Sequence, residues 1–337
     1  MAILYFVARN VFIRAIEVII ITKRKIVGKS RLLLCRPTGG LTDSLGVMYK
    51  CIQYAKKYNR LLIIDTTLSG LHDSLANYFT LQKPIPGLLG LELTPVLTEQ
   101  IIAMSTTQPF QKNRNGIEML QYQTEINAHT KNCIEPLSGE PTSFDLTRDY
   151  NSDFLIYHYF GGGAHNAIKV LPYLKLRPEV SQKIVQRTNS FSALKYDATH
   201  IRCTDYSIDY QVFLQKLQSK LKTKTLLLCS DNQEVIEYAK NNLHSIELLF
   251  TNSFASLDGT PLHAEESSYY TLSQSKRYNL NIDLLTDLYG LSGSVRFHPA
   301  ILLPSKAQTV KYSGFTILAM HLQKHQTIRN KIFVNND

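Results

Sequence analysis

The feature that most constrains the fold is a pair of apolar segments joined by a glycine turn and a helical segment. The first apolar segment is SRLLLCRP (30–37), the turn is TGGLTDSLG (38–46), the helical segment is VMYKCIQYAKKY (47–58), and the second apolar segment is NRLLIIDT (59–66). Two strands connected through a helix lie parallel in one sheet. Residues 30–66 therefore predict a βαβ unit.

Strand and helix patterns alternate again from about residue 190. Strands are expected at 195–201, 224–232, 245–251 and 300–305 (AILLPS), and helices at 210–221, 233–243, 281–294 and 313–325. Before this series, SDFLIYHYF (152–160) predicts a strand that ends at Gly161–Gly163, residues 176–190 predict a helix, and residues 70–150 predict loops and short helices. We expect an α/β protein with two domains in tandem, 29–188 and 189–337.

The N-terminal segment, residues 1–28, predicts an amphipathic helix. MAILYFVARNVFIRAIEVIIITKRK is apolar apart from Arg9, Asn10, Arg14 and Glu17 before its basic end, and those last three residues share one narrow sector of a helical wheel. Such a helix, followed by Lys23-Arg24-Lys25, suits the surface of an anionic cytoplasmic leaflet. The alternative is a helix packed on the protein's own surface.

Charge and cysteine content narrow the partners and the compartment. The net charge of +10 and pI of about 9.2 favour anionic partners, namely nucleotides, nucleic acid or an anionic membrane face. The five cysteines are scattered without a C-x-x-C pair, which favours a reduced cytosolic compartment. No H-E-x-x-H or D-x-D motif occurs, so we expect no metal. The basic residues are dispersed and no nucleic-acid motif is recognised, so no nucleic-acid partner is expected.

Candidate ligand-binding residues follow the predicted strands, where α/β sheets bind their ligands. His200, Arg202 and Asp205 lie at the carboxyl end of one strand, and arginine offers a fork of donors suited to phosphate. Gly39-Gly40 lies between a strand and a helix, where backbone N–H groups can meet an anion. The alternatives are a surface loop with an Arg202–Asp205 ion pair and a tight turn with no ligand.

Two further candidates lie near the C-terminus. Asp283 and Asp287 are four residues apart on one helix face, and a carboxylate there could accept hydrogen bonds from a guanine edge or form a solvated acidic edge. Ser313-Gly314 precedes an apolar helix and predicts an N-cap with phosphate-binding potential, although capping alone is the commoner use.

These pieces, in this order, resemble the fucosyltransferase superfamily. HIRCTDY (200–206) is similar to its H-x-R-x-x-D signature, and residues 39–66 are similar to its first βαβ unit. LLLCSDNQEVIEYAKNN (226–242) is similar to the strand, S/T-D turn and helix of its second domain, and DLYGLSGS with YSGFTILA resembles its closing pair of helices. The resemblance implies the GT-B architecture, two Rossmann-like domains facing a cleft, with the acceptor on the first domain and the donor on the second.

The resemblance also assigns roles to residues. Arg202 matches the arginine that binds the donor diphosphate, His200 the histidine near the guanine nucleoside, Asp287 (rather than Asp283) the aspartate that reads guanine, and Ser313 a serine near the phosphates. Gly39 and Gly40 match a loop facing the cleft. Cys203 stands where several members have a second arginine, and Tyr210 stands where the α1,6 enzymes have a candidate catalytic glutamate. Asp209, beside Tyr210, is the candidate base.

The implied activity is that of an inverting, metal-independent fucosyltransferase without a cofactor. It would move fucose from GDP-fucose, or the sugar of a related GDP-sugar, to a hydroxyl of a glycan or glycolipid in surface polysaccharide synthesis. The expected location is the cytoplasm, either free or peripheral on the cytoplasmic face of the inner membrane. The alternative is an inactive GDP-sugar-binding protein of the same fold, and a nucleic-acid protein is a third hypothesis suggested only by charge.

Overall fold

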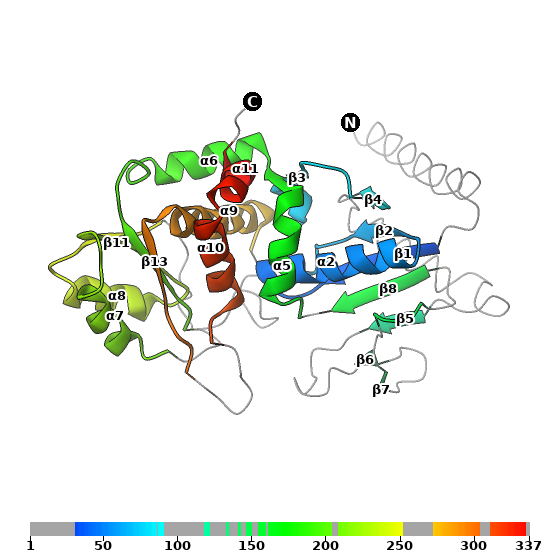
Figure 1. The fold of residues 1–337 in the computed structure, drawn as a ribbon, viewed down its shortest axis with the longest axis horizontal. Helices are drawn as coiled ribbons and strands as arrows, with labels where there is room; N and C mark the ends of the chain where they lie inside the picture. Colours follow the sequence, from blue (N-terminus) through cyan, green and yellow to red (C-terminus); the bar gives the residue numbers. More distant parts are fainter. Residues whose placement is uncertain are drawn as a thin grey trace.

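The computed structural model describes eleven stretches of the chain (Figure 1). They are residues 31–85, 87–90, 118–121, 133–134, 141–142, 146–149, 154–159, 161–203, 208–251, 272–303 and 311–334. The predicted N-terminal helix, 1–28, and Asp205 lie outside the described residues. No described helix is both long enough and apolar enough to cross a membrane.

The predicted βαβ unit forms the centre of a seven-stranded sheet. Its strands β1 (Arg31–Pro37) and β2 (Arg60–Ile64) pair in parallel, with helix α2 (Leu41–Lys57) between them in the chain. The sheet order is β4-β2-β1-β8-β5-β6-β7. The other strands are β4 (Leu88–Gly90), β5 (Glu118–Gln121), β6 (Cys133–Ile134), β7 (Pro141–Thr142) and β8 (Phe154–Tyr159).

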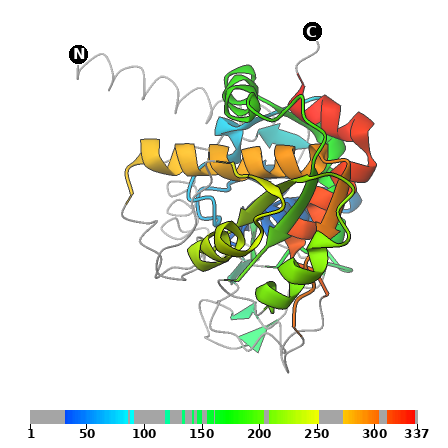
Figure 2. The ribbon, with the colours of Figure 1, turned by 90° about the vertical axis from the view of Figure 1, so that its left-hand side faces the viewer.

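A second sheet contains four parallel strands in the order β12-β11-β10-β13. Its strands are β10 (Asp197–Ile201), β11 (Thr225–Ser230), β12 (Glu247–Leu249) and β13 (Arg296–Pro299), and the connecting helices are α7 (Tyr210–Gln218), α8 (Gln233–Asn242) and α9 (Gln274–Gly293). Figure 2 shows α9 on one side of this sheet and α7 with α8 on the other. Leu227 and Cys229 join the core on the α9 side, and Leu226 and Leu228 join the core under α7 and α8.

The remaining helices join the two sheets. The helices that lie between the sheets or across them are α5 (Ala164–Val170), α6 (Pro178–Thr188), α10 (Gly314–Lys324) and α11 (Gln326–Phe333). The same region contains the 3₁₀ turns η1 (Leu75–Asn77) and η2 (Leu171–Tyr173). It also contains a small antiparallel sheet of β3 (Phe79–Leu81) and β9 (Leu174–Leu176). Helix α10 packs against α2, α5 and α9 (Figure 1). One continuous apolar core therefore includes residues of both sheets, for example Leu33 and Leu227.

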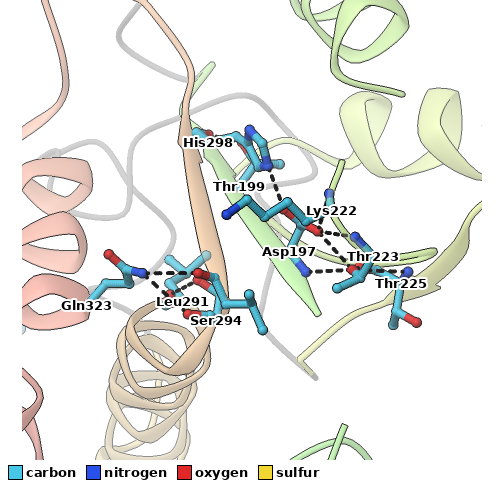
Figure 3. Close-up of polar contacts among 10 residues, drawn as sticks. Asp197, Thr199, Lys222, Thr223, Thr225, Leu291, Ser294, His298 and Gln323 are labelled. Atoms are coloured by element: carbon cyan, nitrogen blue, oxygen red, sulfur yellow. Dashed lines mark hydrogen bonds and ion pairs between the residues drawn. The ribbon is translucent and has the colours of Figure 1, made fainter. Parts of the chain in front are cut away.

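The start of β10 is tied to its neighbours by a buried carboxylate (Figure 3). Asp197 is fully buried; its Oδ1 lies 2.7 Å from His298 Nε2, and its Oδ2 accepts hydrogen bonds from the backbone N–H groups of Lys222 and Thr223. Burial raises the pKa of Asp197, but the hydrogen bonds from His298 and Thr223 together lower it by more, so the pKa lies below its ordinary value. Thr199 adds a hydrogen bond to the His298 carbonyl at 2.7 Å, which fixes the register of β10 and β13.

Two sequence predictions need correction. The predicted strand AILLPS (300–305) is instead β13, Arg296–Pro299, because the strand is set by its pairing with β10; Ile301 and Leu303 are about half exposed beyond it. The expectation of loops and short helices over 70–150 was incomplete: the short helix η1 (Leu75–Asn77) lies there, but so do strands β3 to β7, and β5 pairs in parallel with β8. The tandem division at 188/189 stays a prediction.

Candidate functional site

His200 lies at one end of a buried hydrogen-bonded series. It lies in β10 with Nδ1 2.9 Å from Thr316 Oγ1, and Ser313 Oγ donates to the same Thr316 oxygen at 3.0 Å. The ring of Phe315 contacts the imidazole at 5.0 Å between centroids. Burial, assisted by the positive charge of Arg202, lowers the pKa of His200 to about 3. The predicted residues His200 and Ser313 are therefore brought together, and His200 is neutral near pH 7.

Arg202 lies just beyond the carboxyl end of β10, with about a fifth of its side chain exposed. Its Nε is 3.9 Å from Asp231 Oδ2, and Asp231 Oδ1 accepts a hydrogen bond from the Cys203 backbone N–H at 2.8 Å. The carboxylate therefore holds the arginine-bearing loop against the end of β11. The partly exposed guanidinium remains at the carboxyl ends of the strands, where α/β proteins bind anions.

Two helix N-termini meet beside these strand ends. Helix α2 begins after Gly40, which supplies no side-chain acceptor to the first turn, and a Cβ added at Gly40 would meet no heavy atom within 4 Å. Helix α10 begins after Ser313, and a Cβ on Gly314 would lie 3.0 Å from Thr42 Cγ2 in the first turn of α2. Gly39 is fixed in the same loop, because its carbonyl accepts from Ser44 Oγ and from the Gly70 N–H. The positive ends of two helix dipoles are thus adjacent.

Asp287 and Asp283 have different surroundings, although they share one helix. Asp287 is buried and accepts a hydrogen bond from Thr251 Oγ1, just after β12. It also contributes to the raised pKa of Cys229, behind the larger effect of burial, which places it beside the carboxyl end of β11. Asp283 instead pairs with Arg187 of α6 at 2.5 Å, and burial raises its pKa to about 6 although Arg187 opposes the shift. Asp287 therefore lies at the ends of β11 and β12, whereas Asp283 forms an ion pair with α6.

Asp209 is the N-cap of α7. Its side chain is exposed and Oδ1 accepts a hydrogen bond from the Val212 N–H at 3.1 Å. This contact gives the carboxylate a local structural use, and its role as a base stays a prediction. Cys203 is half-buried, and burial, followed by the charges of Asp231 and Glu234, raises its thiol pKa to about 12.

The glycine run after β8 has a packing role. A Cβ on Gly162 would lie 2.0 Å from the Asp43 carbonyl oxygen and 2.6 Å from Gly46 Cα, so only glycine lets this turn reach the backbone of α2. Asp43 Oδ1 accepts hydrogen bonds from the N–H groups of Gly162 and Gly163. The tight contact is with α2.

Sequence reasoning missed two residues near the site, Thr316 and Thr42, and gave Asp231 no role of its own. Thr316, Asp231 and Thr42 link His200, Arg202 and the two helix N-termini. Asp231 is the aspartate of the S/T-D turn in residues 226–242, but no local pattern pointed to Thr316 or Thr42, because their contacts join distant parts of the chain. Among the described residues, no group of three or more His, Cys, Asp or Glu side chains could hold a metal ion.

Comparison with known proteins identifies the fold. No protein-family profile and no curated protein sequence matches the chain. A solved structure of NodZ alpha-1,6-fucosyltransferase co-crystallised with GDP is similar at 14% identity, with a TM-score of 0.50, covering 87% of this chain and 92% of that one. NodZ from Bradyrhizobium is similar at 14% identity and a TM-score of 0.47, over 87% and 93% of the two chains. A FUT1 variant of Arabidopsis thaliana in complex with GDP is similar at 12% identity and a TM-score of 0.46, covering 87% of this chain and 69% of that one.

The first of these similarities extends over most of both chains. At this level of identity it is a similarity of fold. The chain has a fucosyltransferase-like α/β fold.

Proposed function

We propose that the protein is a glycosyltransferase that uses a GDP-sugar, most specifically GDP-fucose, as its donor. The observation that carries the proposal is the meeting of two helix N-termini beside the carboxyl end of β10, where Arg202 and His200 lie. A diphosphate is the ligand that such a combination of backbone N–H groups and a guanidinium suits best. The structurally similar NodZ protein was crystallised with GDP, which supports the choice of nucleotide.

In the proposed reaction the sugar leaves GDP while negative charge develops on the β-phosphate. Arg202 and the N–H groups at the starts of α2 and α10 would stabilise that charge. Asp287 would accept hydrogen bonds from the guanine edge, as the family resemblance implies. The acceptor would lie towards the first sheet, so that the two halves act as the facing domains of a GT-B enzyme.

The attacking hydroxyl needs a general base if the reaction inverts the anomeric centre. Asp209 is the candidate, and its exposure leaves it accessible although it also caps α7. We further propose that no metal or cofactor is needed, that the acceptor is a glycan or glycolipid of surface polysaccharide synthesis, and that the protein works at the cytoplasmic face of the inner membrane. The net charge of +10 supports an anionic surface as a partner.

A thermal-shift screen with GDP, UDP, CMP and ADP tests the donor. A ligand that binds only the folded state raises its melting temperature, so GDP alone is expected to stabilise the protein. The variant Arg202→Ala is expected to lose most of that stabilisation, whereas Arg296→Ala, which changes an exposed arginine at the start of β13, keeps it. A response to UDP alone, or full transfer activity in Arg202→Ala, would contradict the proposal.

An inactive GDP-sugar-binding protein is the second candidate. Cys203 replaces the second arginine of several superfamily members, and Asp209 is engaged as a cap. Binding of GDP without transfer or hydrolysis of GDP-fucose, with Asp209→Asn behaving like the wild type, would favour this reading.

A further inference from the structure

Ser313, Thr316 and His200 form a buried series whose hydrogen atoms can be counted. Ser313 is 1%, Thr316 2% and His200 8% exposed. Ser313 Oγ accepts from the Thr316 N–H at 3.2 Å and lies 3.0 Å from Thr316 Oγ1, which in turn lies 2.9 Å from His200 Nδ1. Buried polar groups of this kind need partners for every donor hydrogen.

One arrangement satisfies each hydroxyl hydrogen. The Ser313 hydroxyl donates to Thr316 Oγ1, and the Thr316 hydroxyl then donates to His200 Nδ1. The reverse arrangement would have His200 Nδ1–H donate to Thr316 and Thr316 donate to Ser313. The Ser313 hydrogen would then have no acceptor within the described part of the chain, and a buried donor would be left without a hydrogen bond.

The position of the hydrogen on the His200 imidazole follows from this arrangement of hydrogen bonds. Burial and Arg202 lower the pKa of His200 to about 3, so the imidazole carries one hydrogen near neutral pH. With Nδ1 accepting from Thr316, that hydrogen is on Nε2. Within the described residues Nε2 makes no hydrogen bond, and Phe315 packs against the ring and restricts its rotation.

We propose that Thr316 is a positioning residue that holds His200 as the Nε2–H tautomer, so that this site presents a neutral hydrogen-bond donor, and never an acceptor, to its ligand. If the protein binds a GDP-sugar as proposed above, His200 then donates its Nε2 hydrogen to an acceptor oxygen or nitrogen of the nucleotide. Such a donor adds no charge beside Arg202, and a tautomer fixed in advance avoids reorganisation on binding.

Long-range nitrogen–proton NMR of the histidine rings tests the tautomer without any ligand. The chain has ten histidines, so the His200 signals are assigned by their loss in His200→Gln. We expect one ring with a protonated Nε2 and an unprotonated Nδ1. A protonated Nδ1, or a doubly protonated ring near neutral pH, would overturn the inference.

Binding of GDP to two variants tests the positioning role. Thr316→Val removes the hydroxyl at nearly constant volume and is expected to weaken GDP binding about fivefold to tenfold, the equivalent of one hydrogen bond. Thr316→Ser keeps the hydroxyl and is expected to restore both the affinity and the His200 spectrum. Wild-type affinity in a folded Thr316→Val protein, or no rescue by serine, would contradict the role. If the wild type itself binds no GDP, the proposed function fails while the NMR result still decides the tautomer.

Discussion

At the scale of single residues, burial makes His200 sensitive to acid. Its pKa is about 3 in the folded protein against an ordinary value of 6.5, so the unfolded chain binds more protons between these values. The contribution of neutral His200 to stability is therefore fully present above pH 6.5 and falls as the pH is lowered from there towards 3.

We predict that His200→Gln reduces this acid sensitivity. Between about pH 7 and about pH 5 the wild type is expected to lose on the order of 2 kcal/mol of unfolding free energy through His200. Urea unfolding at both pH values measures the difference, and His244→Gln, which changes an exposed histidine, is the control. An equal pH dependence in the wild type and His200→Gln would be inconsistent with a buried neutral imidazole.

Two glycines at the site should respond differently to alanine. Gly162→Ala is expected to lower the free energy of unfolding by about 3 kcal/mol, because the new Cβ would lie 2.0 Å from the Asp43 carbonyl oxygen. Gly40→Ala has open space around its Cβ and is expected to lose less than about 1 kcal/mol, while it weakens GDP binding by obstructing the approach to α2. Chemical unfolding and GDP titration of both variants separate packing from ligand approach. Equal stability of the two variants would refute the distinction.

At the scale of elements, the starts of β1 and β2 are held by a carboxylate. Asp149 Oδ1 accepts from Arg60 Nη2 at 2.9 Å, Oδ2 lies 2.5 Å from Arg31 Nη2, and the Arg60 side chain is fully buried. Removing the partner of a buried charge costs more than the pair contributes, since the remaining charge has lost its water as well.

Asp149→Ala is therefore expected to lower the free energy of unfolding by about 3 kcal/mol. Glu237→Ala on α8, where the carboxylate is exposed and, among the described residues, accepts only from the Gln233 side chain, is the matched control and should change it by less than about 0.5 kcal/mol. Urea midpoints with unchanged slopes measure both. Similar losses in the two variants would show that Arg60 finds another partner.

At the scale of the whole molecule, the two sheets share one core. Asn281 of α9 donates to the Leu71 carbonyl at 2.9 Å and to the Tyr78 hydroxyl at 2.8 Å, and Tyr78 donates to Asp73 at 2.6 Å. Helix α11 adds a contact from its end, where the Phe333 carbonyl accepts from Ser181 Oγ. The two halves are thus joined by buried polar contacts as well as by apolar packing.

We expect a single cooperative unfolding transition, with equal calorimetric and van't Hoff enthalpies. Asn281→Ala should lower stability by about 2 kcal/mol because it leaves buried groups without partners, whereas Asn279→Ala, two residues away on the exposed side of α9, should have little effect. Scanning calorimetry measures both. Two resolved transitions in the wild type would mean that the sheets unfold independently.

The sequence by itself determined the α/β class, the first βαβ unit, most strands of the second sheet and the position of His200 and Arg202 at a strand end. Each of these follows from a local pattern, because apolar runs and helical spacing fix the type of an element. The tertiary structure decided the strands within 70–150, the place of β13 and the use of Thr316, since pairing and burial involve partners far away in the chain. For the same reason only the fold could bring Gly314 against Thr42 and so place two helix N-termini at one site.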